Sequence, residues 1–188
     1  MSRVILGVDP GLTRCGVAVI ASKSSRQIEL LHVDTLKSSA DLELSTRLGS
    51  IADGIEALIL AHKPTQIAVE RVFAQANVRS VMGVAQISGV VLYLAQKHQI
   101  PVQMHTPSEV KAAVTGSGRA QKAQMGLAVT KILGLSEVPK PADSADAIAI
   151  AICNAWKGSV AQNAGVAKTP AQAAWAAAER VASRRTKA

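Results

Sequence analysis

The run at residues 4–8, Val-Ile-Leu-Gly-Val, constrains the fold of this chain more than any other segment. A half-buried strand alternates apolar and polar residues, whereas a continuous apolar run is typical of a central strand covered on both faces. The run ends at Asp9-Pro10-Gly11, a sequence typical of a tight turn. It is too short and too sharply ended for a signal peptide, and it predicts a sheet covered by helices on both faces.

The hydrophobic patterns that follow predict an alternation of strands and helices. Strands at 15–21 and 28–36 come after short turns, so they are expected to form an antiparallel meander with the first strand. The later elements are a helix at 42–61, a strand at 66–70, a helix at 78–97, a strand at 101–105, and helices at 107–114, 120–133 and 143–156. Ser39 or Asp41 is expected to cap the first helix. The sequence thus predicts an α/β fold, a mixed five-stranded sheet with an antiparallel meander, parallel strands and helices on both faces.

The charge of the chain indicates a polyanionic partner. Its 188 residues include 21 Lys and Arg against 13 Asp and Glu, a formal net charge of +8, which favours nucleic acid or an anionic membrane surface. No apolar run reaches the length of about 18 residues that a membrane span needs. Cys15 and Cys153 form no disulfide or metal-binding pattern, so we expect a cytoplasmic protein.

The length suits one compact domain followed by a basic appendage. All the expected elements fall within residues 1–156, which are therefore expected to form one folded domain. Residues 157–188 are rich in Ala and hold six Lys or Arg against one Glu. We expect this tail to be flexible or loosely helical, and its composition leaves open whether it solubilises the chain or binds a polyanion.

Four carboxylates fall where this fold would bring them together. Asp9 and Glu70 each end a predicted buried strand, and Asp143 and Asp146 lie three residues apart on one face of the last helix. Each alone has a structural explanation, because such acids also begin loops or interact favourably with a helix dipole. The alanines around Asp146 would, however, let the helix approach the sheet closely, so we expect the four acids to converge.

Converging carboxylates repel one another unless cations neutralise them. Oxygen ligands without His or Cys select hard divalent ions, here Mg²⁺ with Mn²⁺ as a substitute. Two such ions about 3.5–4 Å apart suit phosphodiester cleavage, in which one activates water and the other stabilises the leaving oxygen. The sequence therefore predicts a nuclease with two metal ions per site, held by Asp9, Glu70, Asp143 and Asp146.

Three stretches carry a family resemblance: residues 5–11, 67–73 and 142–152, each containing at least one of these acids. In their order and spacing they resemble the RuvC family of Holliday-junction resolvases, in the ribonuclease-H-like superfamily, and the similarity covers residues 3–156. The resemblance implies a homodimer that cuts four-way DNA junctions in recombination and repair by paired symmetric nicks, which leave 5′-phosphate and 3′-hydroxyl ends. It also implies work with a branch-migration motor complex, and it makes the four acids catalytic.

Basic residues crowd the segment 71–122, where a single acid occurs. Lys111 and Lys122 match basic positions near the active site of the family. Lys122 follows a glycine-containing loop at 116–118, so it is expected to approach a phosphate and offset developing charge, although a solvated surface lysine is the alternative. The further DNA contacts expected in this segment are Arg79 and Arg119.

Phe73 is the only phenylalanine of the chain and lies three residues after Glu70, in a predicted loop with small or polar neighbours. A core role is therefore unexpected, and the family resemblance makes it a wedge that stacks on or displaces a base at the junction centre. His105, at a predicted strand end, is expected to be a hydrogen-bonded core histidine.

The helix predicted at 78–97 is apolar around most of its circumference, which indicates burial on several sides. In so small a chain this favours a homodimer interface along the helix. Many family members have Gly-Gln-Ala-Arg-Gly here, whereas this chain has Ala85-Gln86-Ile87-Ser88-Gly89. The missing arginine removes one DNA or interface contact and leaves the acids unaffected.

Two functions of other classes remain open. Residues 9–16 also fit the DxGxTxxG phosphate loop of actin-like and sugar-kinase-like ATP-binding proteins, but those proteins need a duplicated domain, and no second copy occurs. The other alternative is a module that binds junction DNA without cutting it. The presence of all four acids favours the enzyme, and Mg²⁺-dependent cleavage of four-way junctions distinguishes the two.

Overall fold

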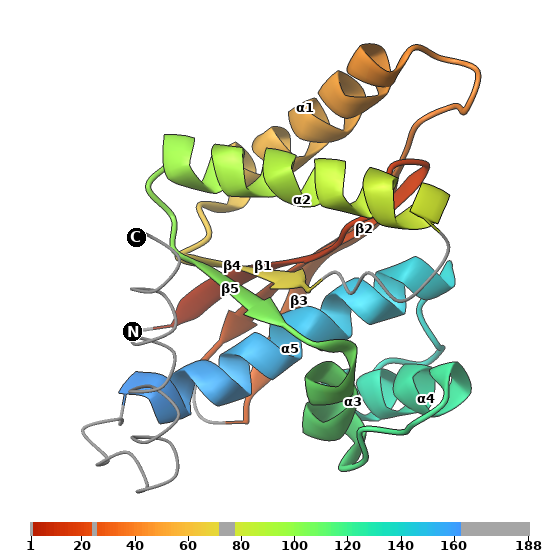
Figure 1. Cartoon of the computed structure of the whole chain (residues 1–188). Helices are drawn as coiled ribbons and strands as arrows, with labels where there is room; N and C mark the ends of the chain where they lie inside the picture. Colours follow the sequence, from red (N-terminus) through yellow and green to blue (C-terminus); the bar gives the residue numbers. More distant parts are fainter. Residues whose placement is uncertain (1, 24–25, 72–77, 163–188) are drawn as a thin grey trace, which may run out of the picture. The chain divides into compact units, whose positions relative to one another are not determined.

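A computed structural model of the chain describes residues 2–23, 26–71 and 78–162, without the side chains of 78–80 and 158–162. Its centre is a five-stranded sheet (Figure 1). In spatial order the strands are β3 (Ile28–Lys37), β2 (Arg14–Ser22), β1 (Arg3–Asp9), β4 (Gln66–Glu70) and β5 (Val102–His105). The first three strands of the chain form an antiparallel meander, and β4 and β5 continue the sheet parallel to β1. The predicted mixed sheet is confirmed.

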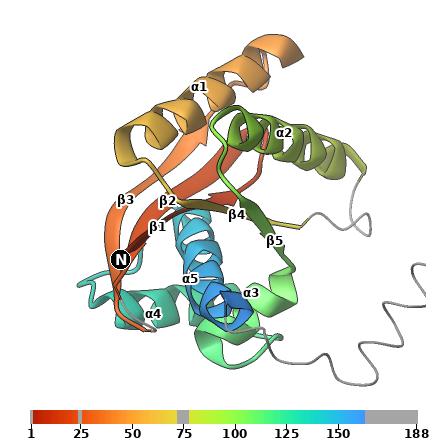
Figure 2. The ribbon, with the colours of Figure 1, turned by 90° about the vertical axis from the view of Figure 1, so that its left-hand side faces the viewer.

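Helices cover both faces of this sheet, as predicted (Figure 2). One face carries α1 (Leu44–His62) and α2 (Val78–Lys97). The other carries α3 (Pro107–Thr115), α4 (Lys122–Leu133) and α5 (Ala142–Gln162). The largest difference from the predicted boundaries is at α5, which continues past Trp156.

The expected cap of α1 is wrong. The helix begins after Glu43, whose side chain makes no capping hydrogen bond. Ser39 and Asp41 lie upstream, where the Ser39 hydroxyl donates to the Asp41 carboxylate at 3.1 Å. Because these two side chains satisfy each other in the preceding turn, neither is used at the helix end.

Strand β1 shows why the first apolar run has no polar interruption. Ile5 belongs to a core formed with α3, α4 and α5. Leu6 and Val8 of the same strand belong to a second core formed with α1 and α2. Side chains alternate across a strand, so a strand between two helical layers must be apolar at successive positions.

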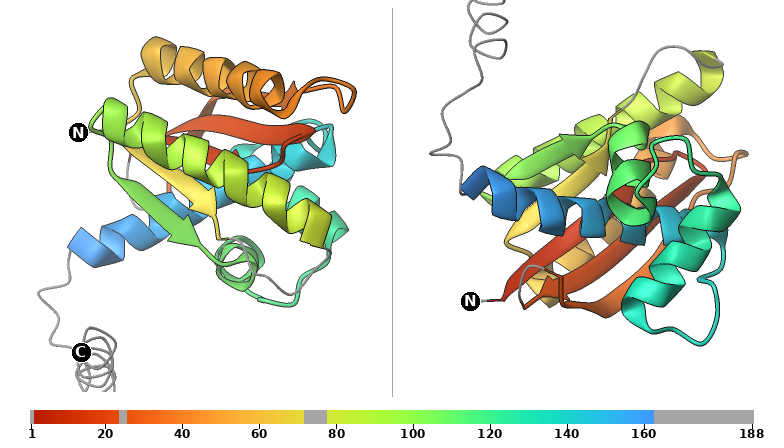
Figure 3. Two further views of the ribbon diagram at one scale, coloured as in Figure 1. Left: turned by 45° about the horizontal axis from the view of Figure 1, so that its top comes forward. Right: turned by 90° about the horizontal axis from the view of Figure 1, so that it is seen from below.

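Helix α5 lies against the sheet at backbone contact distance (Figure 3, right). A Cβ added to Gly7 of β1 would lie 2.4 Å from the carbonyl oxygen of Ala147. One added to Gly16 of β2 would lie 2.3 Å from the carbonyl oxygen of Asp143. These two glycines therefore let the helix that carries Asp143 and Asp146 descend onto the strand ends, the close approach expected from its alanines.

The chain divides into two units, residues 1–157 and 158–188. Of the second unit the structure describes only the end of α5, so the expected form of the tail lies outside the described residues. No helix in the described ranges combines the length and hydrophobicity needed to cross a membrane.

Candidate active site

The four predicted acids meet at one edge of the sheet. Strands β1 and β4 run parallel and adjacent, so Asp9 and Glu70 end at the same edge. Asp143 and Asp146 reach this edge from the first turns of α5. One carboxylate oxygen each from Asp9, Asp143 and Asp146 lies within 4.8 Å of the others, and Glu70 lines one cavity with Asp9 and Asp146. The three aspartates thus converge closely, and Glu70 joins them as a lining residue of the shared cavity.

The nearby cations do not balance the negative charge of the clustered carboxylates. Burial, followed by repulsion from Glu70, Asp146 and Asp143, raises the pKa of Asp9 from 3.8 to about 7, and Lys122 opposes this only in part. Burial and the nearby Asp146 raise the pKa of Glu70 as well. A divalent cation bound among these carboxylates would stabilise their ionised forms and relieve their mutual repulsion.

The donor set fits a divalent metal ion. It consists of carboxylate oxygens at the end of a rigid sheet, with no His or Cys among the clustered groups. Hard cations such as Mg²⁺, Mn²⁺ and Ca²⁺ prefer such oxygen ligands, whereas softer ions favour nitrogen or sulfur. The predicted metal site therefore agrees with the side chains that the fold brings together.

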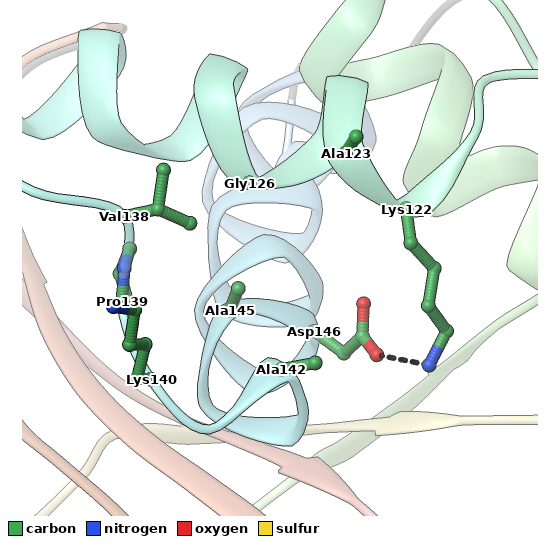
Figure 4. Close-up of a pocket in the computed structure, with 9 residues that line it drawn as sticks. All are labelled: Lys122, Ala123, Gly126, Val138, Pro139, Lys140, Ala142, Ala145 and Asp146. Carbon is green, nitrogen blue, oxygen red and sulfur yellow. Dashed lines mark hydrogen bonds and ion pairs between the residues drawn. The ribbon is translucent and has the colours of Figure 1, made fainter.

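Two cations contact acids of the cluster directly. Lys122, at the first residue of α4, extends to Asp146 with 3.4 Å between its Nζ and Oδ2, beside a cavity lined by Val138 and Lys140 (Figure 4). The Lys122 side chain is 77% exposed, so it can leave Asp146 for a phosphate. Arg14 donates from Nε to Asp143 Oδ2 at 2.7 Å.

Sequence reasoning missed Arg14. The signal that could have found it is the hairpin register, in which Asp9 of β1 pairs with Gly16 of β2. That register returns Arg14 to the edge that holds the acids. Its contact with Asp143 also needs the position of α5, which is remote in sequence.

Lys111 of α3 lies at the predicted place, because it lines the cavity that contains Asp9, Glu70 and Lys122. Helix α3 is held there by a capping box between Thr106 and Glu109 and by an ion pair of 2.7 Å between Glu109 and Lys157.

The structure does not bring every predicted DNA contact to the acids. Arg119 is exposed and lines a separate cavity with Ser117, Gln124 and Leu127. Phe73 and the side chain of Arg79 lie outside the described residues. The roles expected for Arg119, Phe73 and Arg79 therefore stay predictions.

His105 is a hydrogen-bonded core histidine, as predicted. It is 4% exposed, and its Nε2 lies 2.9 Å from Asn154 Oδ1. Asn154 in turn donates to Gln66 Oε1 at 2.9 Å, which fixes its amide orientation and makes His105 Nε2 the donor. This chain of bonds ties β4 and β5 to α5.

Replacing Asp9 by Asn is expected to stabilise the metal-free protein at alkaline pH. The pKa of Asp9 is higher in the folded than in the unfolded chain. The stability contributed by the protonated Asp9 carboxyl is therefore complete below about pH 4 and is lost as the pH rises through about 7. The melting temperature of Asp9→Asn should match that of the wild type at pH 4 and exceed it by several degrees at pH 8. Asp53→Asn, at an exposed position of α1, is the control. A difference between Asp9→Asn and wild type that does not change with pH would contradict the repulsion.

Known proteins are similar to this chain in sequence and in fold. The family profile described as crossover junction endodeoxyribonuclease RuvC matches residues 5–154. The chain belongs to the RuvC family. A crossover junction endodeoxyribonuclease of Leifsonia xyli subsp. xyli is 50% identical over 98% of this chain and 95% of its own length. One from Streptomyces griseus is 55% identical over 85% of this chain and 78% of its own length.

Solved structures agree with this assignment. The RuvC of T. thermophilus, solved in complex with a Holliday junction substrate, superposes with a TM-score of 0.80 at 34% identity, over 85% of this chain and 96% of its own. The yeast mitochondrial resolvase Ydc2 shares the fold, with a TM-score of 0.61 at 14% identity. The resemblance inferred from the three motifs, the ribonuclease-H-like fold and the assignment as a crossover junction endodeoxyribonuclease are confirmed.

Proposed function

We propose that the protein resolves four-way DNA junctions in recombination and repair by paired symmetric nicks, which leave 5′-phosphate and 3′-hydroxyl ends. The observation that carries this proposal is the convergence of Asp9, Asp143 and Asp146 to within 4.8 Å in a RuvC-family chain. The T. thermophilus relative is described with a Holliday junction as its substrate. A net charge of +8 supports a DNA substrate.

The acids Asp9, Glu70, Asp143 and Asp146 are the proposed ligands of two Mg²⁺ ions, which Mn²⁺ can replace. When bound, such ions activate water and stabilise the leaving oxygen. Lys122 exchanges its contact with Asp146 for the scissile phosphate, where its ammonium offsets the charge that develops during cleavage. Lys111, on the wall of the same cavity, binds the strand beside that phosphate.

The remaining predicted contacts complete the proposal. Phe73 acts as the wedge at the junction centre, and Arg79 and Arg119 bind backbone phosphates farther from the cut. Residues 1–156 are the nuclease domain, and the basic residues of 157–188 add to the attraction for DNA. From the family resemblance we also infer a cytoplasmic location and a branch-migration motor complex as partner.

The two sides of helix α2 support the proposal of a homodimer along it. Ile87, Val91 and Leu94 are buried against the sheet and α1. Met82, Leu92 and Tyr93 are 56%, 43% and 66% exposed, on a helix that lies beside α1 over the same face of the sheet (Figure 3, left). The apolar pattern that predicted burial on several sides is thus only partly satisfied within one chain. A second copy would cover the rest and supply the second active site that paired nicking needs.

Ser88, the residue that replaces the frequent family arginine, belongs to the buried side of α2. It is 5% exposed, and its hydroxyl donates to the carbonyl oxygen of Val84 at 2.8 Å. Ser88 therefore contributes to helix packing and is too buried to contact DNA or a partner itself.

The double variant Leu92→Arg/Tyr93→Glu is expected to be monomeric at micromolar concentration, because it places charges in the proposed interface. Light scattering measures the mass, and a junction cleavage gel scores paired against single nicks. Leu60→Arg, at an equally exposed apolar residue of α1, should leave the wild-type mass and paired nicking unchanged. A monomeric wild type, or a dimeric double variant, would contradict the interface.

The decisive test of function is cleavage of a synthetic four-way junction in Mg²⁺, with a linear duplex of the same sequence as control. The expected products are symmetric nicks that a ligase seals, with little cutting of the duplex and none in a chelator. Tight junction binding without any metal-dependent cleavage would instead support the non-cutting module.

A further inference from the structure

The turn between β1 and β2 forms one wall of another cavity, which is basic and is distinct from the cavity that holds the acids. This cavity of about 430 Å³ is lined by Gly11, Leu12, Thr13, Arg14, Arg47, Gly83 and Val84. No carboxylate lines it, and two of the seven residues are arginines. The predicted role of Arg119, Lys111 and Lys122 in binding DNA does not involve this cavity.

Arg47 is held in the cavity by neutral groups alone. Its Nη2 donates to the Thr13 hydroxyl at 2.8 Å and its Nε to the Ser38 hydroxyl at 3.1 Å. It forms no ion pair with any carboxylate of the described residues. A half-buried guanidinium that is fixed in place without a counter-charge is suited to binding an anion.

Arg14 connects this cavity to the acidic cluster. Its Nε is bonded to Asp143, and its side chain is 49% exposed. Its two terminal nitrogens make no hydrogen bond to the part of the chain that the structure describes. Since a guanidinium has five N–H donors in a fixed fork, Arg14 can hold Asp143 and a phosphate at the same time.

The wall that presents these groups is rigid. The Ser38 hydroxyl donates to the carbonyl oxygen of Leu12 at 2.5 Å. The backbone N–H of Ser38 donates to the carbonyl oxygen of Thr13 at 3.1 Å. A Cβ on Gly11 would lie 2.1 Å from the carbonyl oxygen of Arg14, so the turn needs glycine at this position. Binding an anion there requires little ordering of the protein.

We propose that this cavity binds a backbone phosphate of the substrate strand next to the scissile one, through Arg14 and Arg47. The proposal rests on the proposed function, because it assigns the strand that crosses the acids a second, pre-formed contact. Arg14 then acts as a positioning residue as well, since the phosphate and Asp143 share its guanidinium. The sequence Asp-Pro-Gly-Leu-Thr-Arg, which also fits a nucleotide phosphate loop, here serves a DNA phosphate.

The test replaces single phosphates on either side of the cut by neutral methylphosphonates and measures junction binding in Ca²⁺. For the wild type, one neighbouring position should weaken binding about tenfold, in line with the loss of one charged contact. Arg47→Met and Arg14→Gln should bind the natural junction about tenfold more weakly, reduce the slope of log K against log salt by about 0.9, and lose the response to that methylphosphonate. Arg26→Gln, at an exposed position between β2 and β3, should keep the wild-type response.

The outcomes separate the two proposals. If the wild type does not cut the natural junction in Mg²⁺, the proposed function fails. If it cuts and both variants respond to every methylphosphonate as the wild type does, the cavity is not a phosphate site. A loss of cleavage in Arg14→Gln with an unchanged binding response would mean that Arg14 acts on Asp143 alone, and would also overturn the phosphate site. Should Arg47→Met melt below the assay temperature, the exposed Arg14→Gln decides.

Discussion

Asp146→Asn is expected to lower the rate of junction cleavage by about 10³-fold or more while junction affinity stays within about threefold. The substitution keeps the size of the side chain and removes one charge from the centre of the cluster. Asp146 lines the same cavity as Asp9 and Glu70, and its carboxylate also accepts from Lys122. Its loss therefore weakens both the cation site and the placement of the ammonium group.

Single-turnover rates in Mg²⁺ and equilibrium binding in Ca²⁺ measure the two quantities separately. Asp53→Asn makes the same chemical change at an exposed position of α1, and its rate should equal that of the wild type. Asp146→Asn protein that cuts at the wild-type rate would exclude the acid from catalysis. Equal losses in binding and cleavage would show that the residue holds DNA and does not act on the cut.

The position of the acids was predictable because it depends on regularities of single elements. Parallel strands end at one edge, which places Asp9 beside Glu70. A three-residue spacing places Asp143 and Asp146 on one helix face. The run at residues 4–8 defined the layer arrangement for the same reason, since alternation along one strand is local information.

Other features could not be predicted, because they depend on pairs of elements. The contact of Arg14 with Asp143 joins residues 129 positions apart and exists only because α5 rests on β2. The sequence also could not show which side of α2 is exposed, because apolar residues surround the helix almost evenly. Only the packed fold shows that Ile87 is buried and Tyr93 is not. At α1, the hydrogen bond between Ser39 and Asp41 keeps both expected capping residues away from the helix end.

Gly16→Ala is expected to damage both the fold and the active site. The added methyl group would lie 2.3 Å from the carbonyl oxygen of Asp143 and 2.9 Å from its carbonyl carbon, so the first turn of α5 must move away from β2. Overpacking against backbone costs about 1–3 kcal/mol, which lowers the melting temperature of a chain of this size by about 3–10 °C. Because the displaced residue is itself one of the four acids, a shift of about 1 Å should also reduce cleavage by about 10²-fold.

Gly49→Ala separates this effect from the general cost of a methyl group. A Cβ at Gly49 of α1 meets nothing within 4 Å, and alanine favours a helix over glycine by about 0.5–1 kcal/mol, so this variant should melt slightly higher and cut normally. Cleavage is measured well below both melting temperatures, so that a slow rate reflects the position of Asp143 and not unfolded protein. If Gly16→Ala cuts like the wild type at that temperature, then α5 can move without displacing Asp143. The position of Asp143 would in that case not depend on the close approach of helix and sheet at Gly16.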